Sequence, residues 1–191
     1  MNDQQTDPTK FPVLTTERLI LRELINSDID ELINLRSDAQ VNQYLDRPKS
    51  ITIEEAAAFV EKINNGLSKR WYYWVISVNA DEKLIGTICL WNFDEINKTI
   101  EVGYELMPPF QGRGLMREAL RKVIEFGFDT AGFKQIIAYT NDGNARSKSL
   151  LEKAGFIRDQ SFEKELRSKN THVDDIMFSL KNVVSLQKIQ G

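Results

Sequence analysis

The residues best suited to chemistry lie in a loop between an expected strand and an expected helix. This loop reads Pro108-Pro109-Phe110-Gln111-Gly112-Arg113-Gly114-Leu115-Met116. The two prolines stop strand pairing, and the two glycines let another group approach the backbone closely. The helix that follows directs its free N–H groups and the positive end of its dipole into the loop. Such a loop is suited to holding an anion such as a diphosphate, with Arg113 or Arg117 adding positive charge.

A glycine pair before a helix can also be an ordinary tight turn, so the loop alone does not define a reaction. It lacks the Gly-Lys-Ser/Thr ending of an ATP-binding P-loop and the wider glycine spacing of a dinucleotide-binding fold. Phosphoryl transfer and hydride transfer are therefore the weaker interpretations of this loop.

Two glutamates in the strand before the loop are candidates for proton transfer. Side chains alternate along a strand, so over 99–107 Glu101, Gly103 and Glu105 share one face and the opposite face is apolar. The two carboxylates lie four residues apart, roughly 13 Å, which is too far to share a proton. Either one could accept a proton directly or through water. Both could equally be solvated residues on the polar face of an outer strand.

A serine hydroxyl is the third candidate group. In a helix over 144–154, Ser147 shares a face with Leu150, Leu151 and Ala154 at the i, i+3, i+4, i+7 spacing. The hydroxyl therefore points with the apolar face. A serine in this place can also simply bond back to the preceding helical turn.

The elements that position these groups are those of a mixed α/β domain with helices on both faces of the sheet. The pattern predicts strands at 18–24, 71–78, 83–92, 99–107, 134–140, 156–165 and 171–180, and helices from Ser27, over 52–65, over 114–130 and over 144–154. A turn is expected at 167–170. The strands 99–107 and 134–140 flank the long helix, so a crossover should make them parallel.

The bulk composition indicates one domain and excludes several classes of protein. The chain has 191 residues, 41% of them hydrophobic, and a formal net charge of −3. We expect a polar N-terminal lead at 1–10, a single domain at 11–182 and a tail at 183–191. The negative net charge provides no basic field for nucleic acid or a membrane surface. With one cysteine, no apolar signal segment and no long apolar run, we expect a cytoplasmic protein without a metal or a membrane span.

Three ordered motifs resemble the GCN5-related N-acetyltransferase (GNAT) family. The segment 111–116 is similar to the family's acetyl-CoA loop, Gln/Arg-x-x-Gly-x-Gly/Ala, and departs from it at Met116. The segment 144–156 resembles the family's Asn-x-x-Ser helix that ends in Gly-Phe. The segment 15–22 resembles the opening of the ribosomal-protein N-terminal acetyltransferase (RimJ/RimL) subgroup, and 101–106 resembles that subgroup's Glu-Ile-Gly-Tyr strand.

The resemblance implies an acetyl-CoA-dependent N-acetyltransferase that acts by direct transfer in a ternary complex. It implies that the sheet splays between strands 99–107 and 134–140 and that pantetheine fills the gap as an extra strand. It implies Glu101 as the base and Ser147 as a proton donor to the thiolate, with Tyr104 or Tyr139 as substitutes. The acetyl-CoA contacts that it implies are Leu106, Met107, Gln111, Gly112, Arg113, Gly114, Leu115, Met116, Asn144 and Ser147.

The acceptor stays open at this point. The subgroup implies a protein N-terminal α-amine, while similar chains acetylate small amines, amino-acid analogues or antibiotics. We expect the segment 41–71 to help build the acceptor pocket. The competing interpretations are a non-catalytic acyl-CoA sensor and an RNA-associated structural domain. The oligomeric state could be a monomer or a homodimer.

The remaining residues have simpler interpretations. We expect His172 to be structural or exposed, Cys89 to be inert, and the tryptophans to belong to the core, with Tyr104 and Tyr139 more typical of core residues than of acids. Trp91 and Phe93 could wall an acceptor pocket, and this is the weaker interpretation of the pair.

Overall fold

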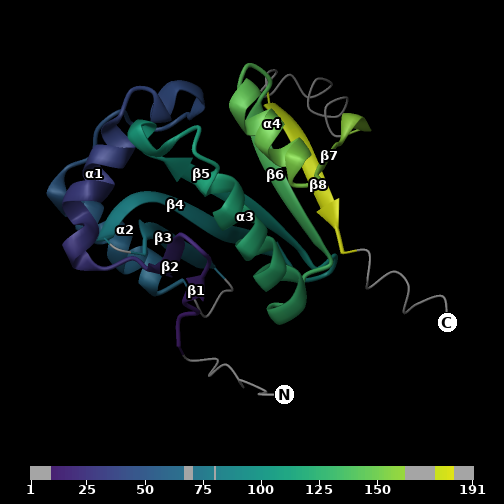
Figure 1. Cartoon of the computed structure of the whole chain (residues 1–191), viewed down its shortest axis with the longest axis horizontal. Coiled ribbons are helices and arrows are strands. Elements are labelled where there is room, and N and C mark those ends of the chain that lie inside the picture. Colours follow the sequence, from purple (N-terminus) through teal and green to yellow (C-terminus); the bar gives the residue numbers. More distant parts are fainter. Residues whose placement is uncertain (1–9, 67–70, 80, 162–174, 183–191) are drawn as a thin grey trace.

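The computed structural model describes residues 10–66, 71–79, 81–161 and 175–182. In this part of the chain one sheet of eight strands runs through the molecule in the order β1-β2-β3-β4-β5-β6-β8-β7 (Figure 1). The strands are β1 (Leu14–Thr15), β2 (Leu19–Glu23), β3 (Tyr72–Val78), β4 (Asp81–Asp94), β5 (Thr99–Leu106), β6 (Gln135–Asn141), β7 (Ile157–Arg158) and β8 (Asp175–Lys181). The predicted mixed α/β fold is confirmed, with one strand beyond the expected seven because β1 is too short to leave a pattern.

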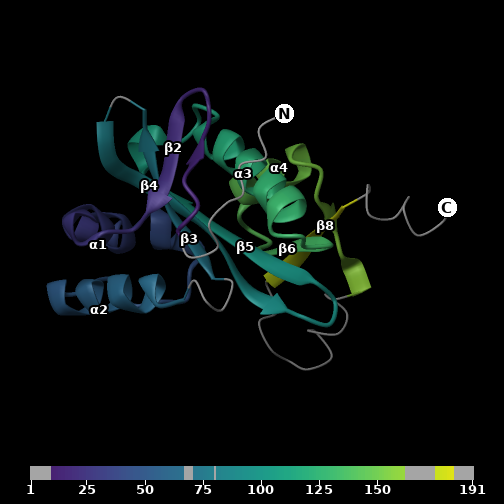
Figure 2. The same ribbon diagram turned by 90° about the horizontal axis from the view of Figure 1, so that it is seen from below.

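Two pairs of helices cover the two faces of the sheet, as predicted (Figure 2). Helices α1 (Ile29–Ser37) and α2 (Ile53–Asn64) lie on one face, and α3 (Leu115–Glu125) and α4 (Ala145–Lys153) lie on the other. Helix α2 begins with a capping box, Thr52-Ile53-Glu54-Glu55. The Thr52 hydroxyl accepts the Glu55 N–H at 3.2 Å, and the Glu55 carboxylate accepts the Thr52 N–H at 2.8 Å.

Each face of the sheet has its own hydrophobic core. Strand β3 contributes to both, because Trp74 and Ile76 pack toward α3 while Tyr73 and Val75 pack toward α1 and α2. Helix α3 buries the predicted face, including Leu120, which is fully buried. Burying one such leucine contributes about 1.5–3 kcal/mol. The core therefore fixes α3 firmly against the sheet.

Among the described strands, β5 and β6 are the only parallel neighbours, and they are paired over a short stretch. The register runs from Thr99 opposite Gln135 to Glu101 opposite Ile137 and then stops. On their outer sides β5 stays paired with β4 as far as Leu106, and β6 stays paired with β8 as far as Asn141. The two strands therefore part beyond Glu101. This confirms the splay that the family resemblance implies.

The last part of the sheet differs from the prediction. In the described part of the strand expected at 156–165, only Ile157–Arg158 form a strand, and Gln160 and Ser161 are helical, while 162–165 lie outside the described residues. The helix expected at 114–130 ends in a π-helical turn, Phe126–Thr130. The predicted turn at 167–170 and His172 lie outside the described residues, as do 1–9 and 183–191. Among the described residues no helix is long and apolar enough to span a membrane.

Candidate active site

The loop before α3 presents its backbone to solvent. Gly112 and Gly114 have left-handed backbone angles (φ 75° and 76°), and a side chain at Gly112 would meet no atom within 4 Å. Gly114 is the N-cap of α3 and provides no side-chain cap. Because L side chains rarely adopt this conformation, the two glycines allow a close turn directly in front of the helix N-terminus. This geometry fits the predicted anion-binding loop.

The loop residues divide into side-chain and backbone contributors. The Leu115 and Met116 side chains are 7% and 8% exposed, so these residues can offer a ligand only backbone N–H groups. The departure from the family pattern at Met116 therefore leaves the loop geometry intact. Arg113 is exposed, with its guanidinium 5.9 Å from the centre of the Phe110 ring. It remains available to an anion at the loop.

The Gln111 side chain forms hydrogen bonds to β5 and to α4, on the two sides of the gap. Its side-chain amide donates to the Leu106 carbonyl at 2.8 Å, and Arg146 of α4 donates to its side-chain oxygen at 2.7 Å. Gln111 thus joins the end of β5 to the start of α4. Its side chain is therefore hydrogen-bonded within the protein, and the acetyl-CoA contact of Gln111 stays a prediction.

The backbone at the end of β5 has one donor directed into the gap. The Met107 N–H donates to the Ile85 carbonyl of β4 at 2.9 Å, and the Met107 carbonyl accepts the Phe110 N–H at 3.0 Å. Backbone groups alternate in direction along a strand, so the Leu106 N–H points the other way, toward β6. Backbone contacts to acetyl-CoA were predicted at both residues. The Leu106 N–H faces the gap, whereas the Met107 N–H and carbonyl are bonded to β4 and to the turn.

Two hydroxyl groups meet across the gap. The Tyr104 hydroxyl lies 2.8 Å from the Ser147 hydroxyl, which joins β5 to the first turn of α4. Burial raises the pKa of Tyr104 to about 12, so the phenol keeps its proton at neutral pH. Asn144 is the N-cap of α4, and its side-chain oxygen accepts the Ser147 N–H at 3.1 Å. The sequence paired Ser147 with no partner, because Tyr104 lies 43 residues away.

Glu101 lies where β5 and β6 part, and its carboxylate is partly buried. Burial raises its pKa above the ordinary value, while hydrogen bonds from Asn92 and Trp91 act against this rise. The Asn92 amide lies 3.4 Å from the Glu101 carboxylate. Within the described part of the chain no arginine or lysine forms an ion pair with it. A carboxylate with a raised pKa is a better proton acceptor near neutral pH.

Glu105 has a different environment. Arg47 donates two hydrogen bonds to its carboxylate, at 2.6 and 2.8 Å, and both side chains are less than one fifth exposed. Arg47 also donates to the Asn42 side chain at 2.6 Å. Glu105 is therefore engaged in a two-point ion pair with Arg47. This contact favours Glu101 over Glu105 as the proton acceptor.

Two predictions for aromatic residues on β4 and β6 need correction. Trp91 and Tyr139 are 40% and 39% exposed, whereas the sequence predicted core positions for both. Asn92 has φ 54°, and the β4–β5 register shifts between Trp91 and Asp94. This bulge leaves Phe93 partly buried against the core, with its ring centre 5.2 Å from that of Phe133, and its place in the wall of an acceptor pocket stays a prediction.

The other tryptophans and the cysteine follow expectation more closely. Trp74 is fully buried, and Trp71 packs against the α1–α2 core. Burial raises the pKa of Cys89 to about 12, so its thiol stays protonated and unreactive.

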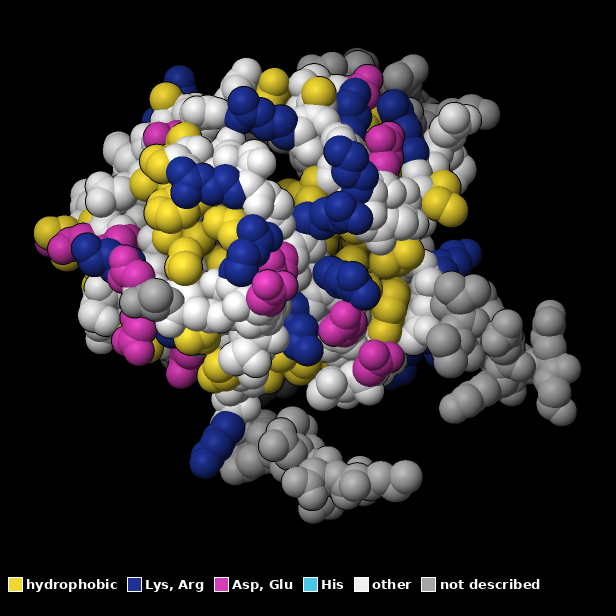
Figure 3. Space-filling view, in the orientation of Figure 1, with side chains coloured by type: hydrophobic (Ala, Val, Ile, Leu, Met, Phe, Trp, Pro, Cys, Tyr) yellow, Lys and Arg dark blue, Asp and Glu magenta, His cyan; other side chains and the backbone are white. Residues whose placement is uncertain are grey.

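The face of the molecule that carries α3 and α4 is hollowed between these two helices. In the space-filling view Lys and Arg side chains gather around this hollow (Figure 3). Exposed Arg113 and Arg117 belong to the α3 side, and Arg146 and Lys148 belong to α4. Basic groups around this hollow favour a ligand with several negative charges.

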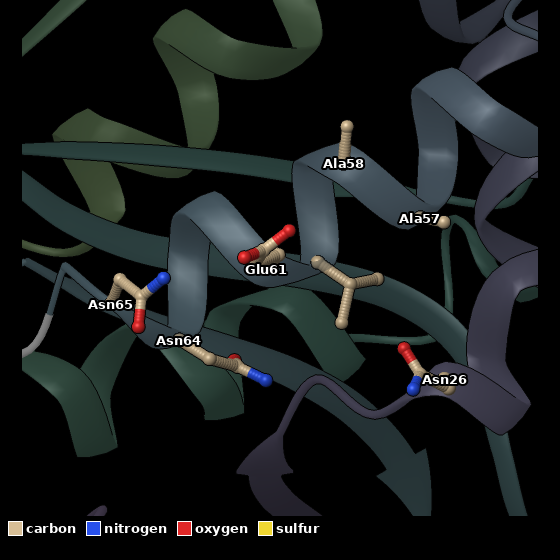
Figure 4. Close-up of a pocket in the computed structure, with 7 residues that line it drawn as sticks. Asn26, Ala57, Ala58, Glu61, Asn64 and Asn65 are labelled. Carbon is tan, nitrogen blue, oxygen red and sulfur yellow. The ribbon is translucent and has the colours of Figure 1, made fainter.

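A separate depression lies on α2, away from these groups. It is lined by Asn26 and by α2 residues between Ala57 and Asn65 (Figure 4). Its polar lining consists of amides and one carboxylate, Glu61, with no nucleophile or basic side chain. We assign no chemistry to it.

Comparison with known proteins supports one family. A family model described as an acetyltransferase (GNAT) domain matches residues 18–157. The uncharacterized N-acetyltransferase YoaA of Bacillus subtilis (strain 168) is 29% identical over 171 residues, which are 89% of this chain and 97% of the relative. The ribosomal-protein-serine acetyltransferase of Escherichia coli (strain K12) is 24% identical over 86% of this chain and 92% of its own length.

A solved structure has the same fold. RimL, a ribosomal L7/L12 alpha-N-protein acetyltransferase in complex with coenzyme A, superposes with a TM-score of 0.74 at 20% identity. The match covers 89% of this chain and 98% of that one. At this level of identity the likeness concerns the fold.

Proposed function

The chain belongs to the GNAT acetyltransferase family, and from this premise we propose that it transfers the acetyl group of acetyl-CoA directly to a primary amine, with Glu101 as base and Ser147 as acid. The observation that carries the assignment is the parting of β5 and β6 directly after Glu101. It puts a carboxylate with a raised pKa at the inner end of the gap and a hydroxyl pair across it.

The residues of the chain fit acetyl-CoA in three respects. The loop at 112–116 supplies backbone N–H groups in front of an α3 that has no side-chain cap, which suits the diphosphate. Leu106 directs a backbone N–H into the gap, which suits a pantetheine amide or the thioester oxygen. The basic rim suits the remaining phosphate (Figure 3). When bound, acetyl-CoA supplies the activated acyl group and a thiolate leaving group.

The proton path follows from the positions of the side chains. An ammonium group must lose a proton before its nitrogen can attack, and Glu101 accepts that proton, directly or through a water. Ser147 donates its hydroxyl proton to the departing sulfur. The nitrogen loses its second proton to water as the C–N bond forms and the C–S bond breaks, and Ser147, hydrogen-bonded to the Tyr104 hydroxyl at 2.8 Å, regains a proton from water. The Leu106 N–H stabilises negative charge on the carbonyl oxygen.

We propose a protein N-terminal α-amine as the acceptor. The relatives named as ribosomal-protein acetyltransferases support this class. Exposed Trp91 and Tyr139 lie near the Glu101 carboxylate. The Trp91 side chain forms a hydrogen bond to this carboxylate. Burial, and to a smaller extent the negative charge of Glu101, raises the pKa of Tyr139. Aromatic rings beside a carboxylate suit an ammonium group. A cytoplasmic, reducing setting fits the unpaired Cys89.

The test measures release of the CoA thiol with a panel of amines. The panel contains peptides with free N-termini, the same peptides with blocked N-termini, polyamines and aminoglycosides. Turnover with free but not blocked peptides, and its loss in Glu101→Gln, is the expected result. Glu125→Gln, on the exposed side of α3, is the matched control and should retain activity. Coenzyme A binding without turnover on any amine would favour a sensor and overturn the proposal.

A further inference from the structure

Arg18, at the start of β2, contacts the loop before α3 although 95 residues separate them in sequence. One of its guanidinium nitrogens donates to the Arg113 carbonyl at 3.0 Å. Its other nitrogens approach one oxygen of Glu118 at 2.7 and 2.6 Å. A single guanidinium thus spans the loop and the first turn of α3.

Glu118 is fixed on its second oxygen as well. That oxygen accepts the Arg18 backbone N–H at 2.9 Å and the Thr16 hydroxyl at 2.6 Å. Desolvation opposes ionisation of Glu118, but the hydrogen bonds from Thr16 and Arg18 prevail and lower its pKa. The carboxylate therefore stays ionised at neutral pH and balances the charge of Arg18. We call Thr16, Arg18 and Glu118 the loop clamp.

The clamp determines which way one peptide group of the loop points. In a planar trans peptide the C=O and the following N–H point in opposite directions. Because Arg18 holds the Arg113 carbonyl, the Gly114 N–H must point away from Arg18. A Cβ at Gly114 would lie 3.6 Å from the Arg18 guanidinium, whereas a Cβ at Gly112 would meet nothing within 4 Å. Arg18 therefore closes one side of the loop and leaves the other open.

We propose that Arg18 is a positioning residue for the acetyl donor: it orients the Arg113–Gly114 peptide so that the Gly114 N–H faces the diphosphate of acetyl-CoA. Arg18 does not touch the donor itself. Its charge is balanced by Glu118, so its effect is geometric. The inference rests on the proposed use of this loop for acetyl-CoA.

Glu118→Gln separates geometry from charge, because the two predict opposite signs. Coenzyme A is strongly anionic, so removing a nearby carboxylate should tighten binding if electrostatics alone mattered. If the clamp positions the peptide, the same change loosens Arg18 and weakens binding, by about fivefold to tenfold for loss of a charged hydrogen bond. Calorimetric titration of coenzyme A into both proteins measures the sign. Equal or tighter binding by Glu118→Gln would overturn the inference.

Arg18→Lys tests the need for the two-armed guanidinium. A lysine can keep the ion pair with Glu118 but cannot also reach the Arg113 carbonyl. We expect about a fivefold or greater rise in KM for acetyl-CoA, with kcat little changed. The matched control is Arg121→Gln, which removes an arginine from an exposed Arg–Glu pair on the same helix and should behave as wild type. A wild-type KM for acetyl-CoA in Arg18→Lys would contradict the geometric role.

A shortened donor distinguishes positioning from general damage to the fold. S-acetylpantetheine lacks the diphosphate, so kcat/KM for it should be the same in wild type and Arg18→Lys. Equal losses with both donors would show a merely structural role and overturn the inference. Equal affinity of wild type and variants for coenzyme A would overturn the inference on Arg18 and leave the proposed function standing. Absence of any binding by folded wild type would instead overturn the proposed function, and the inference with it.

Discussion

Glu101 and Glu105 share one face of β5, yet their neighbours give them different chemistry. Arg47 holds Glu105 through two hydrogen bonds, while Glu101 has a polar but uncharged environment and a raised pKa. The sequence predicted that both would lie on one face, because the alternation of side chains along a strand depends only on neighbouring residues. The choice between them depends on Arg47, which is 58 residues away from Glu105 and could not be identified by spacing.

The hydroxyl pair gives a prediction at the same scale. Ser147→Ala should lower kcat by about 100-fold, since it removes the proposed proton donor to the sulfur. Tyr104→Phe should lower kcat by about tenfold, because Ser147 keeps its hydroxyl and loses only a hydrogen-bond partner. Steady-state kinetics with saturating acetyl-CoA measures both. If Tyr104→Phe were the more damaging of the two, the tyrosine would be the acid and our assignment of Ser147 would be wrong.

At the scale of the element, local signals predicted the helices well. The capping box of α2 and the Asn144 cap of α4 were visible in sequence because caps depend on residues within one turn. The bulge in β4 was not visible, since it depends on how Asn92 fits between neighbouring strands. For that reason the sequence predicted a core position for Trp91, whereas the structure exposes Trp91 and packs Phe93 partly buried against the core.

The segment between Tyr44 and α2 is tied to β5 through Arg47, which yields a second prediction. Arg47→Ala should lower the free energy of unfolding by about 1–3 kcal/mol, because it leaves the Glu105 carboxylate largely buried without a partner. Glu105→Gln should cost less. Urea unfolding measures both changes.

The double variant is the control for this ion pair. Arg47→Ala combined with Glu105→Gln should be more stable than Arg47→Ala alone, because no uncompensated charge remains. Strictly additive losses would show that the two residues act independently and would contradict the ion pair as a tether.

At the scale of the whole molecule, the sheet is strong on both sides of a local break. Strand β4 pairs with β5 to Leu106 and β8 pairs with β6 to Asn141, while β5 and β6 part after Glu101. Sequence patterns predicted the strands and their parallel direction, and the family resemblance implied the splay. The acceptor could not be predicted in this way, because a fold accommodates many acceptors and their contacts come from segments far apart in sequence.

A ligand that joins the two sides of the break should stabilise the whole domain. At coenzyme A concentrations about 100 times its Kd, the gain is about 2.7 kcal/mol. For a domain of this size, that corresponds to a rise in Tm of about 5–10 °C. Thermal unfolding with and without coenzyme A measures it. Pantetheine at the same concentration should give a smaller rise, since it lacks the diphosphate. No rise with coenzyme A would contradict binding across the splay.

The most direct test of the account is the pH dependence of kcat/KM for wild type and Glu101→Gln. The base must be deprotonated, so activity should rise with pH through the raised pKa of Glu101, above the ordinary glutamate value of about 4.3. In Glu101→Gln this acid limb should vanish and the rate should fall by about 100-fold or more, with coenzyme A affinity unchanged. A variant that keeps the wild-type rate and the same acid limb would contradict the assignment of Glu101 as the base.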